Sequence, residues 1–351
     1  MVNIISRLKK SGLAGRGGGC FPAWKKWQMV KEAEDKVKYV ICNASEGEPG
    51  VKKDYYILKN YPQQVVNGMK IAIDFFMAEK AFLYLNHDYY KKLYSKLIKL
   101  ISNSRIKIIK KNYAAGYIGG EETALINYIE KKRVEPRIRP PFPTTRGLWE
   151  CPTLVNNVET FYSIGLIAAE QYEHKRFYTI NGDCLWNGVY EYPEDWAIEK
   201  VLKTSKNFPD FNFFIQVGGD ASGEVLNKKQ LKRPVSGSGS ITIYSMYKHE
   251  PLDLMKKWIN FFVSESCGQC TPCREGSMRI KELLYEKNPE WNIISNLLDN
   301  LSETSFCGLG CAVSIPFRSF VKNVLAFMPD SNIGLSKIQK KKICDCFSKH
   351  S

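Results

Sequence analysis

The chain has 351 residues, 44% of them hydrophobic and 25% charged, so it can bury a large core and its length suits two or three domains. It holds no stretch of roughly 18 apolar residues and no N-terminal secretory signal, so we expect a cytoplasmic protein without a membrane-spanning helix. The formal net charge is +15, but the basic residues are spread along the chain without a nucleic-acid-binding motif, so no nucleic acid partner is expected.

The first half of the chain alternates strand and helix patterns. Strands are predicted at 36–45, 80–86 and 105–113, and amphipathic helices at 62–78 and 88–100 between them. Alternation of this kind is typical of a parallel sheet covered by helices. Residues 1–175 are therefore predicted to form an α/β domain.

The second half changes character twice. Residues 176–248 contain short strands and turns with one helix at 196–205, which indicates a small β-rich domain. Residues 249–351 follow helical spacing and include the most closely spaced cysteines of the chain. We therefore predict three domains, with boundaries near residues 175 and 248.

A glycine-rich segment lies near the N-terminus. The stretch "SGLAGRGGGCFPAWKKW" (11–27) places Gly15, Gly17 and Gly18 around Arg16, with Lys26 downstream. Glycine lets the backbone approach a ligand and point its N–H groups at a phosphate, although a purely structural loop is the alternative.

Polar residues gather where strands end and helices begin. They are Asn43, Glu46 and Glu48 at the end of the first predicted strand, Glu121 and Glu122 at a helix start that follows Gly120, and Asn156, Asn157 and Thr160 in "TLVNNVETF" (153–161). The carboxyl ends of strands are where α/β folds bind ligands. Helix capping and helix-dipole compensation are the alternative interpretation of the same residues.

The chain has 11 cysteines and 4 histidines, and three cysteines are spaced as Cys267-x2-Cys270-x2-Cys273. Clustered cysteines in a cytoplasmic protein indicate metal or redox chemistry before disulfides. Runs of C-x2-C-x2-C are typical of cubane iron–sulfur clusters, and the fourth ligand would come from Cys307 or Cys311. A zinc site is the alternative, although zinc prefers paired cysteines or histidine partners.

Seven segments taken together resemble one family. They are "GRGGGCFP" (15–22), "NASEGEPG" (43–50), "YIGGEETAL" (117–125), "PPFP" (140–143), "GLWECPTLVNNVET" (147–160), "ESCGQCTPCREG" (265–276) and "CGLGCA" (307–312). They resemble, in the same order, the motifs of the NADH-oxidising flavin subunit of respiratory complex I. The same module occurs as the diaphorase subunit of NAD-linked hydrogenases and formate dehydrogenases.

The resemblance implies a fold and a set of cofactors. The fold would be α/β, with a Rossmann-like FMN- and NADH-binding domain (1–175), a β-grasp domain (176–248) and a helical bundle (249–351) holding a [4Fe–4S] cluster. The implied enzyme is an NADH dehydrogenase in which NADH (or NADPH) reduces FMN and single electrons pass to the cluster. No side chain need act as nucleophile or general base, because the cofactors carry the chemistry.

The resemblance also assigns the site residues. The FMN phosphate and ribityl chain fall to Gly15, Arg16, Gly17, Gly18 and Lys26, and flavin binding to Asn43, Asn156, Asn157 and Thr160, with Glu46, Tyr117, Gly120 and Glu121 around the flavin. The dinucleotide pocket would be lined by Phe21, Glu48, Glu122 and Phe142, of which Glu48 and Glu122 would position the nicotinamide. The cluster ligands would be Cys267, Cys270, Cys273 and Cys307.

The sequence departs from the family's motifs at the edges of the pocket. Ser45 replaces an aspartate, Cys20 a glycine, Arg139 a lysine and Gly119 a cysteine, and Trp24 is a bulky change. These changes define an alternative function, a non-catalytic electron-transfer or scaffold subunit that keeps the cluster but binds the dinucleotide poorly.

The resemblance finally implies partners. Because the chain begins almost at the glycine loop, we expect a thioredoxin-like [2Fe–2S] subunit and a further electron-accepting iron–sulfur subunit as separate chains. Contact with a membrane would be indirect, through a complex on its cytoplasmic face. The terminal acceptor, and the choice between NADH and NADPH, are open at this stage.

Overall fold

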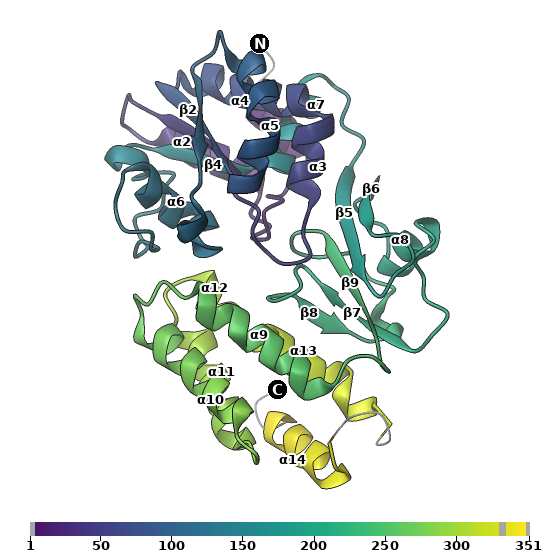
Figure 1. The fold of residues 1–351 in the computed structure, drawn as a ribbon. Helices are drawn as coiled ribbons and strands as arrows, with labels where there is room; N and C mark the ends of the chain where they lie inside the picture. The colour runs from purple at the N-terminus through teal and green to yellow at the C-terminus, as the bar shows by residue number, and fades with distance from the viewer. Residues whose placement is uncertain (1–3, 330–334, 349–351) are drawn as a thin grey trace. The chain divides into compact units, whose positions relative to one another are not determined.

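The structure is a computed structural model that describes residues 4–329 and 335–348. It divides into two compact units (Figure 1). Unit 1 comprises residues 1–47, 52–177 and 191–194, and unit 2 comprises residues 48–51, 178–190 and 195–351, apart from those not described. The predicted boundaries at 175 and 248 stay a prediction.

Unit 1 is built on a parallel sheet. Its strands are β1 (Tyr39–Ala44), β2 (Lys80–Leu85), β3 (Ile106–Lys110) and β4 (Thr153–Asn157), in the order β3-β2-β1-β4. Every pairing within it is parallel, as the alternation of strands and helices predicts. The first three strands were predicted from the sequence, whereas β4 lies in a segment that was interpreted only as polar and capping.

Helices cover both faces of this sheet. They are α1 (Ile4–Ser11), α2 (Ala23–Glu32), α3 (Lys53–Asn60), α4 (Pro62–Phe76), α5 (His87–Ile101), α6 (Glu122–Ile129) and α7 (Val158–Ala168), with the short 3₁₀ turns η1 (Tyr113–Ala115), η2 (Ile118–Gly120) and η3 (Leu148–Glu150). Alternate strand residues, among them Ile41 and Val155, pack on Leu125 and Ile126 of α6. Helices α4 and α7 pack on each other and against β1.

The strand order creates a topological switch point. The chain runs from β1 outward to β2 and β3 and then returns to place β4 on the other side of β1. Connections therefore leave the carboxyl ends of β1 and β4 in opposite directions, and ligands of α/β proteins bind in the crevice that this leaves. The register pairs Asn43 with Asn157, so the last polar residues of the two strands are neighbours at this point.

Unit 2 contains most of a second sheet and a set of helices. The sheet has the order β6-β5-β9-β7-β8, from β5 (Lys175–Gly182), β6 (Gly188–Pro193), β7 (Phe213–Val217), β8 (Glu224–Leu226) and β9 (Ser240–Ser245). The boundary between the units falls within β5 and β6. Strands β5 and β9 are parallel, and β7 is antiparallel to β8 and β9. One helix, α8 (Ile198–Thr204), interrupts the strands, in agreement with the prediction at 196–205.

The remaining helices of unit 2 follow the sheet. They are α9 (Pro251–Glu265), α10 (Ser277–Tyr285), α11 (Trp291–Thr304), α12 (Gly308–Ala312), α13 (Ser314–Asn323) and α14 (Lys337–Ser348), with the 3₁₀ turns η4 (Lys228–Gln230) and η6 (Leu325–Phe327) and one π-helical turn, η5 (Pro272–Gly276). The buried rings of Trp258, Phe317 and Phe320 pack together and join α9 to α13. Asn323 and Ser319 of α13 hydrogen-bond to the backbone of β8 and cover that edge of the sheet.

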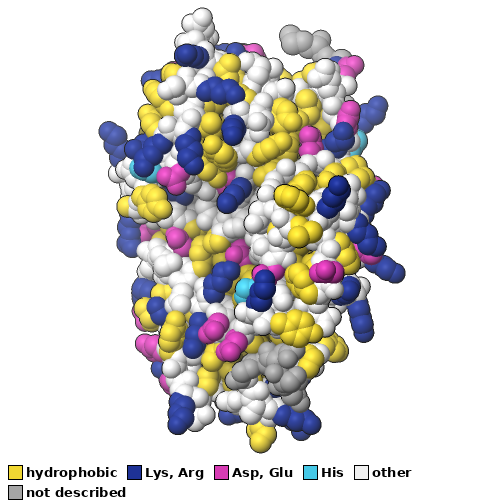
Figure 2. All heavy atoms as spheres, turned by 45° about the vertical axis from the view of Figure 1, so that its right-hand side comes forward, with side chains coloured by type: hydrophobic (Ala, Val, Ile, Leu, Met, Phe, Trp, Pro, Cys, Tyr) yellow, Lys and Arg dark blue, Asp and Glu magenta, His cyan; other side chains and the backbone are white. Residues whose placement is uncertain are grey.

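Charged side chains of both signs occur on the surface. On the face drawn in Figure 2, lysine and arginine side chains are scattered among acidic and apolar ones. Within the part of the chain that the structure describes, no helix is both long and apolar enough to cross a membrane.

Candidate functional site

The glycine segment forms a closed loop with an exposed tip. The backbone N–H of Gly15 donates to the carbonyl of Phe21 (2.8 Å), and that of Ala23 donates to Leu13 (2.9 Å). Gly17, Gly18 and Gly19 are exposed at the tip, and a Cβ built on Gly18 or Gly19 would have no atom within 4 Å. Gly18 has a φ of 108°, which favours glycine. The tip therefore presents bare backbone to an open space.

The loop rests on the first turn of α7. The backbone N–H of Arg16 donates to Thr160 Oγ1 (3.0 Å). A Cβ added to Gly17 would lie 3.3 Å from the Cβ of Asn157, so the loop and α7 are already in close contact. Asn157 also caps α7, since its Oδ1 accepts the N–H of Glu159 (2.9 Å). Both Asn157 and Thr160 thus have structural partners.

The side chain of Arg16 points into the protein. Its guanidinium donates to Tyr172 (3.2 Å) and to Glu194, and the residue is 6% exposed. Burial alone would lower its pKa, but Glu159 and Glu194 raise the pKa overall. Of the predicted phosphate cradle, the structure therefore brings the backbone around Arg16, rather than its guanidinium, to the loop surface.

At the end of β1, Asn43 and Glu46 are also engaged. Asn43 Nδ2 donates to the carbonyl of Gly120 (2.7 Å), and its Oδ1 accepts from Ser45 Oγ (2.7 Å). Glu46 is half-buried, and its carboxyl group accepts the backbone N–H groups of Asp54 (3.0 Å) and Tyr55 (3.4 Å). Burial and the neighbouring Asp54 raise the pKa of Glu46 to about 7.

A charged group lies between α2 and α6. Lys26 Nζ pairs with Glu122 Oε2 (2.9 Å) and donates to the carbonyl of Val155 (3.1 Å), next to the end of β4. Glu121 caps α6 by accepting the N–H groups of Thr123 (2.9 Å) and Ala124 (2.8 Å). Arg139 contacts both glutamates. The helix-capping interpretation therefore holds for Glu121, whereas Glu122 forms ion pairs with Lys26 and Arg139.

Asn156 is buried beside α2. With its amide oriented to suit its neighbours, Oδ1 accepts from Trp27 Nε1 (3.2 Å) and Nδ2 donates to the carbonyl of Val155 (3.1 Å).

The aromatic residues predicted for the dinucleotide pocket are exposed, since Phe21 and Phe142 each have 45% of their surface accessible. Tyr117 is half-buried and lies against Gly47.

Glu48 belongs to unit 2. Its Oε1 accepts the backbone N–H groups of Ala221 (3.1 Å) and Ser222 (3.0 Å). These bonds account for the close approach of Gly219, where a Cβ would collide with the Glu48 side chain. The predicted contact of Glu48 with nicotinamide stays a prediction.

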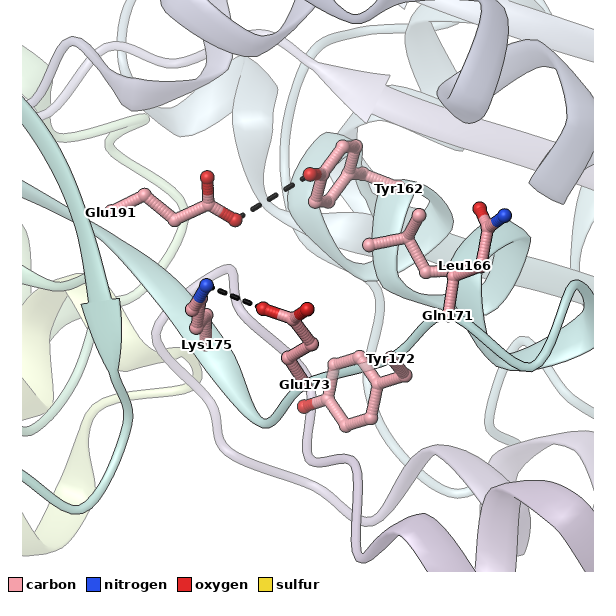
Figure 3. A pocket seen from close by; sticks show the side chains of 7 residues that line it. All are labelled: Tyr162, Leu166, Gln171, Tyr172, Glu173, Lys175 and Glu191. Atoms are coloured by element: carbon pink, nitrogen blue, oxygen red, sulfur yellow. Dashed lines mark hydrogen bonds and ion pairs between the residues drawn. The ribbon is translucent and has the colours of Figure 1, made fainter.

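A cavity of about 250 Å³ lies in unit 1, lined by Tyr162, Leu166, Gln171, Tyr172, Glu173, Lys175 and Glu191 (Figure 3). Tyr162 lies 3.5 Å from Glu191, and Lys175 pairs with Glu173. None of the residues predicted to bind a cofactor lines this cavity. Its polar walls already pair with one another, so we assign it no part in the reaction.

The sequence analysis did not identify a group of buried charged residues next to the loop. Lys53 and Asp54 begin α3, and Lys53 Nζ contacts Asp54 Oδ1 (2.7 Å) and Glu159 Oε2 (3.1 Å). Burial alone would lower the pKa of Lys53, but the carboxylates of Asp54 and Glu159 raise it to about 12. Nothing in "VKKDYYILKN" distinguishes a buried lysine from its exposed neighbours, so only the packing reveals this group.

In unit 2 the structure brings the predicted cluster cysteines together. Burial raises the pKa of the Cys273 thiol, and the nearby Cys270 and Cys267 raise it further. Burial likewise raises the pKa of Cys307 to about 11, with Cys267 and Cys273 adding to the effect. Cys307 thus shares its surroundings with the C-x2-C-x2-C turn, and α12 approaches that turn at Gly310, where a Cβ would lie 3.1 Å from the Cβ of Cys273.

The arrangement of these thiols bears on the choice between a cluster and zinc. Within the described residues no disulfide joins these cysteines. Burial and the nearby Cys270 raise the pKa of the Cys311 thiol, which donates to the carbonyl of Ser305 (3.6 Å). Within residues 4–329 and 335–348, no group of three or more His, Cys, Asp or Glu converges closely enough to hold one metal ion. Zinc needs ligands that converge to about 2.3 Å from a single ion. The thiolates of a [4Fe–4S] cluster bind separate irons, and the C-x2-C-x2-C turn with Cys307 nearby supplies four such thiols.

Two family comparisons cover both regions. Residues 8–166 match the Nuo51 FMN-binding domain, and residues 253–326 match the NADH-ubiquinone oxidoreductase-F iron-sulfur binding region. The first match contains the glycine loop and the switch point, and the second contains the cluster cysteines. The predicted α/β class and the predicted cofactors are thereby confirmed.

Individual relatives agree with these families. The chain is 31% identical to the F subunit of the NADH-quinone oxidoreductase of Streptomyces coelicolor, a match that covers 91% of this chain and 81% of the relative. It is 32% identical to the same subunit of Buchnera aphidicola subsp. Schizaphis graminum, over 97% of this chain and 86% of the relative.

Hydrogenase subunits are also similar. The NAD-reducing hydrogenase HoxS subunit alpha of Cupriavidus necator is 32% identical, over 89% of this chain and 58% of the relative. A chain of the NAD+-reducing [NiFe]-hydrogenase in its H2-reduced state superposes with a TM-score of 0.84 at 30% identity, covering 91% of this chain and 61% of that one. The chain therefore spans less than two thirds of the length of either hydrogenase subunit.

Proposed function

The chain belongs to the family of NADH-quinone oxidoreductase F subunits, and we propose from this premise how its own residues hold the flavin and the cluster. It is an NADH-oxidising flavin subunit, as the sequence motifs predicted. FMN, when bound, accepts a hydride from NADH, and a [4Fe–4S] cluster accepts electrons one at a time. Nothing in the comparisons favours the alternative of a subunit with impaired dinucleotide binding.

The observation that supports the flavin site best is the switch point of the sheet. The carboxyl ends of β1 and β4 are neighbours there, and the glycine loop lies against the first turn of α7, which follows β4. Bare backbone N–H groups and a helix N-terminus both favour a phosphate. We assign the FMN phosphate to the tip of the loop at Gly17 and Gly18.

The predicted side chains then fall into two groups. Some are available to contact the flavin or the dinucleotide, and others position the backbone of the site. Lys26 supplies a positive charge at the end of β4, and Glu122 and the exposed rings of Phe21 and Phe142 are available to the dinucleotide. The protein itself already supplies hydrogen-bond partners to the side chains of Arg16, Glu46, Glu121, Asn156 and Asn157. Their contribution is to orient the backbone that the flavin contacts.

For the cluster we propose Cys267, Cys270, Cys273 and Cys307 as ligands. The proposal is supported by the spacing of the first three and by the pKa of the Cys307 thiol, which burial and the nearby Cys267 and Cys273 raise to about 11. Ser266 Oγ lies 3.5 Å from Cys273 Sγ and orients that sulfur. Cys311 stays outside the ligand set in this proposal.

The relatives belong to multi-subunit complexes, so this chain works with partner subunits. We propose the two predicted partners, a thioredoxin-like [2Fe–2S] subunit and a further iron–sulfur acceptor. The expected location at the cytoplasmic face stays a prediction.

The test is an anaerobic absorption spectrum of the FMN-loaded, cluster-reconstituted protein before and after NADH is added. Bleaching of the flavin band at roughly 450 nm is the expected result. A flavin band that ignores both NADH and NADPH would support the alternative subunit that has lost its hydride donor.

A pair of variants locates the site. Lys26→Met removes the charge next to β4 and is expected to weaken FMN binding about tenfold, because a charged contact is lost. Lys25→Met makes the same chemical change at the exposed neighbouring position of α2 and is expected to bind FMN normally. Equal affinities of the two variants would place the phosphate elsewhere.

A further inference from the structure

Two charged residues at the start of α3, Lys53 and Asp54, are buried, with exposures of 1% and 3%. Taking a charge out of water costs free energy, and a well-packed apolar pair is often as stable as a buried ion pair. Stability alone therefore gives no reason for charges at this place. The partners of the pair indicate a different role.

The start of α3 is held in a fixed position. The carboxylate of Glu46, which follows β1, accepts the backbone N–H of Asp54 (3.0 Å) and the hydroxyl of Tyr89 (2.6 Å). Both buried side chains therefore project from a backbone that is tied to the end of β1. The Lys53 ammonium and the Asp54 carboxylate can therefore fix the position of a side chain that they contact.

What they contact is the amide of Asn157. Lys53 Nζ donates to Asn157 Oδ1 (3.1 Å), and Asn157 Nδ2 donates to Asp54 Oδ2 (2.7 Å). An amide could otherwise rotate by half a turn and exchange its oxygen and nitrogen. Here the exchange would set the amide N–H groups against an ammonium and its oxygen against a carboxylate. The cap bond from the Glu159 N–H (2.9 Å) favours the same orientation of Asn157, and the ion pair adds two contacts that fix the far end of the side chain.

Asn157 in turn supports the glycine loop. A Cβ added to Gly17 would lie 3.3 Å from the Cβ of Asn157, so the two residues are close neighbours, and the backbone N–H of the preceding residue, Arg16, donates to Thr160 of α7. A change in the position of Asn157 would be felt directly by the backbone at Gly17. The chain of contacts runs from α3 through Asn157 to the tip of the loop.

We propose that Lys53 and Asp54 are positioning residues that fix Asn157, and through it the glycine loop, in the conformation that binds the flavin phosphate. The inference rests on the proposed function of that loop. It goes further by assigning a role in flavin binding to two residues that the flavin does not touch.

The experiment measures FMN affinity in the full-length, cluster-reconstituted protein by quenching of FMN fluorescence, together with the melting temperature. Asp54→Asn keeps the shape of the side chain but leaves one of its two oxygen contacts mismatched. We expect it to weaken FMN binding about tenfold or more. The pair replacement Lys53→Met with Asp54→Leu is the second variant, since apolar replacement of both charges is often tolerated by the fold.

The matched control is Leu58→Ala. Leu58 lies on the same helix, is fully buried, and makes no polar contact with Asn157. It is expected to lower the melting temperature at least as much as Asp54→Asn while FMN affinity stays within about twofold. A purely structural role of Asp54 predicts instead that FMN affinity follows the melting temperature in both variants.

A double-mutant cycle completes the test. In an Asn157→Ala background, Asp54→Asn should cause no additional loss of FMN affinity, because the contact it acts through is already gone. Additive losses, or normal FMN binding by Asp54→Asn, overturn the inference while wild-type binding leaves the proposed function intact. If the wild-type protein binds no FMN, the proposed function fails and the inference fails with it.

Discussion

The cysteine region of unit 2 and the glycine-loop region of unit 1 are built in opposite ways. In unit 2, three predicted ligands lie on one short segment around η5, and only Cys307 comes from another part of the chain. In unit 1, the predicted residues come from the loop, the ends of β1 and β4, and the starts of α6 and α7. Several of their polar side chains hydrogen-bond to backbone groups of neighbouring elements or of their own helix.

The difference shows how a motif can be interpreted. The cysteines of the described residues form no disulfide, so closely spaced ones predict metal or redox chemistry directly. Asparagine, glutamate and arginine are equally suited to caps and ion pairs as to ligands. A motif made of such residues marks the region of a site, whereas packing decides which atoms face the ligand.

The largest expected effect tests the cysteine region. Cys270→Ser should abolish the cluster, so that iron and labile sulfide fall to background, because an alcohol does not replace a thiolate ligand. Iron analysis and absorption of the reconstituted protein measure this. Cys344→Ser in α14 is the control and should keep its full iron content. Normal iron in Cys270→Ser would show that the segment does not hold the cluster.

The second prediction concerns the buried lysine of unit 1. Lys53→Met leaves the carboxylates of Asp54 and Glu159 buried without their shared cation, and should cost about 3–5 kcal/mol in the free energy of unfolding. Urea denaturation measures it. Lys52→Met, at the exposed preceding position, should leave stability nearly unchanged. Similar losses in both variants would contradict the buried network.

The third prediction is a pH dependence. Burial raises the pKa of Glu46 from 4.5 to about 7, so the folded protein retains a proton that the unfolded chain releases. Stability from this group is therefore present below about pH 4.5 and is lost as the pH rises towards 7, by about 3 kcal/mol in all.

Glu46→Gln removes that titration. Relative to the wild type, the variant should gain about 3 kcal/mol in the free energy of unfolding between about pH 5 and about pH 8. Glu34→Gln, at an exposed position in the same unit, should follow the wild-type curve. Parallel curves for Glu46→Gln and the wild type would mean that Glu46 is ionised throughout this range.

The smallest expected effect separates the two candidates for the fourth ligand. Cys311→Ser should leave the iron content unchanged. The Cys311 thiol donates to the Ser305 carbonyl, and of the predicted cluster cysteines Cys270 is the one that raises its pKa. Cys307→Ser should lose the intact cluster. Electron paramagnetic resonance of the reduced protein distinguishes the outcomes, and the reverse result would exchange the roles of the two cysteines.

Several features of the fold followed from the sequence alone. The strands at 36–45, 80–86 and 105–113 and the helices at 62–78 and 88–100 were predicted within a few residues of β1, β2, β3, α4 and α5. Their alternation also predicted the parallel sheet. Period and composition are local properties, and they suffice where one element carries its own apolar pattern.

Strand β4 could not be found in the same way. Its residues Thr153–Asn157 are followed at once by α7, and their polar end resembles a cap, which Asn157 also provides. The strand exists because β1 offers a free edge to pair with, and that edge is a property of the sheet. Strand β8 likewise depends on packing, since it is short and α13 covers its outer edge.

The sequence by itself determined the class of fold and the family, and it gave the prediction of which cysteines hold a cluster, since the order and spacing of residues along the chain carry each of these. The tertiary structure alone decided that Lys53 and Asp54 orient Asn157, that Arg16 turns inward, and that Glu46 caps α3. Those partners are far apart in the chain, and a hydrogen bond between them depends on how the sheet and its helices pack.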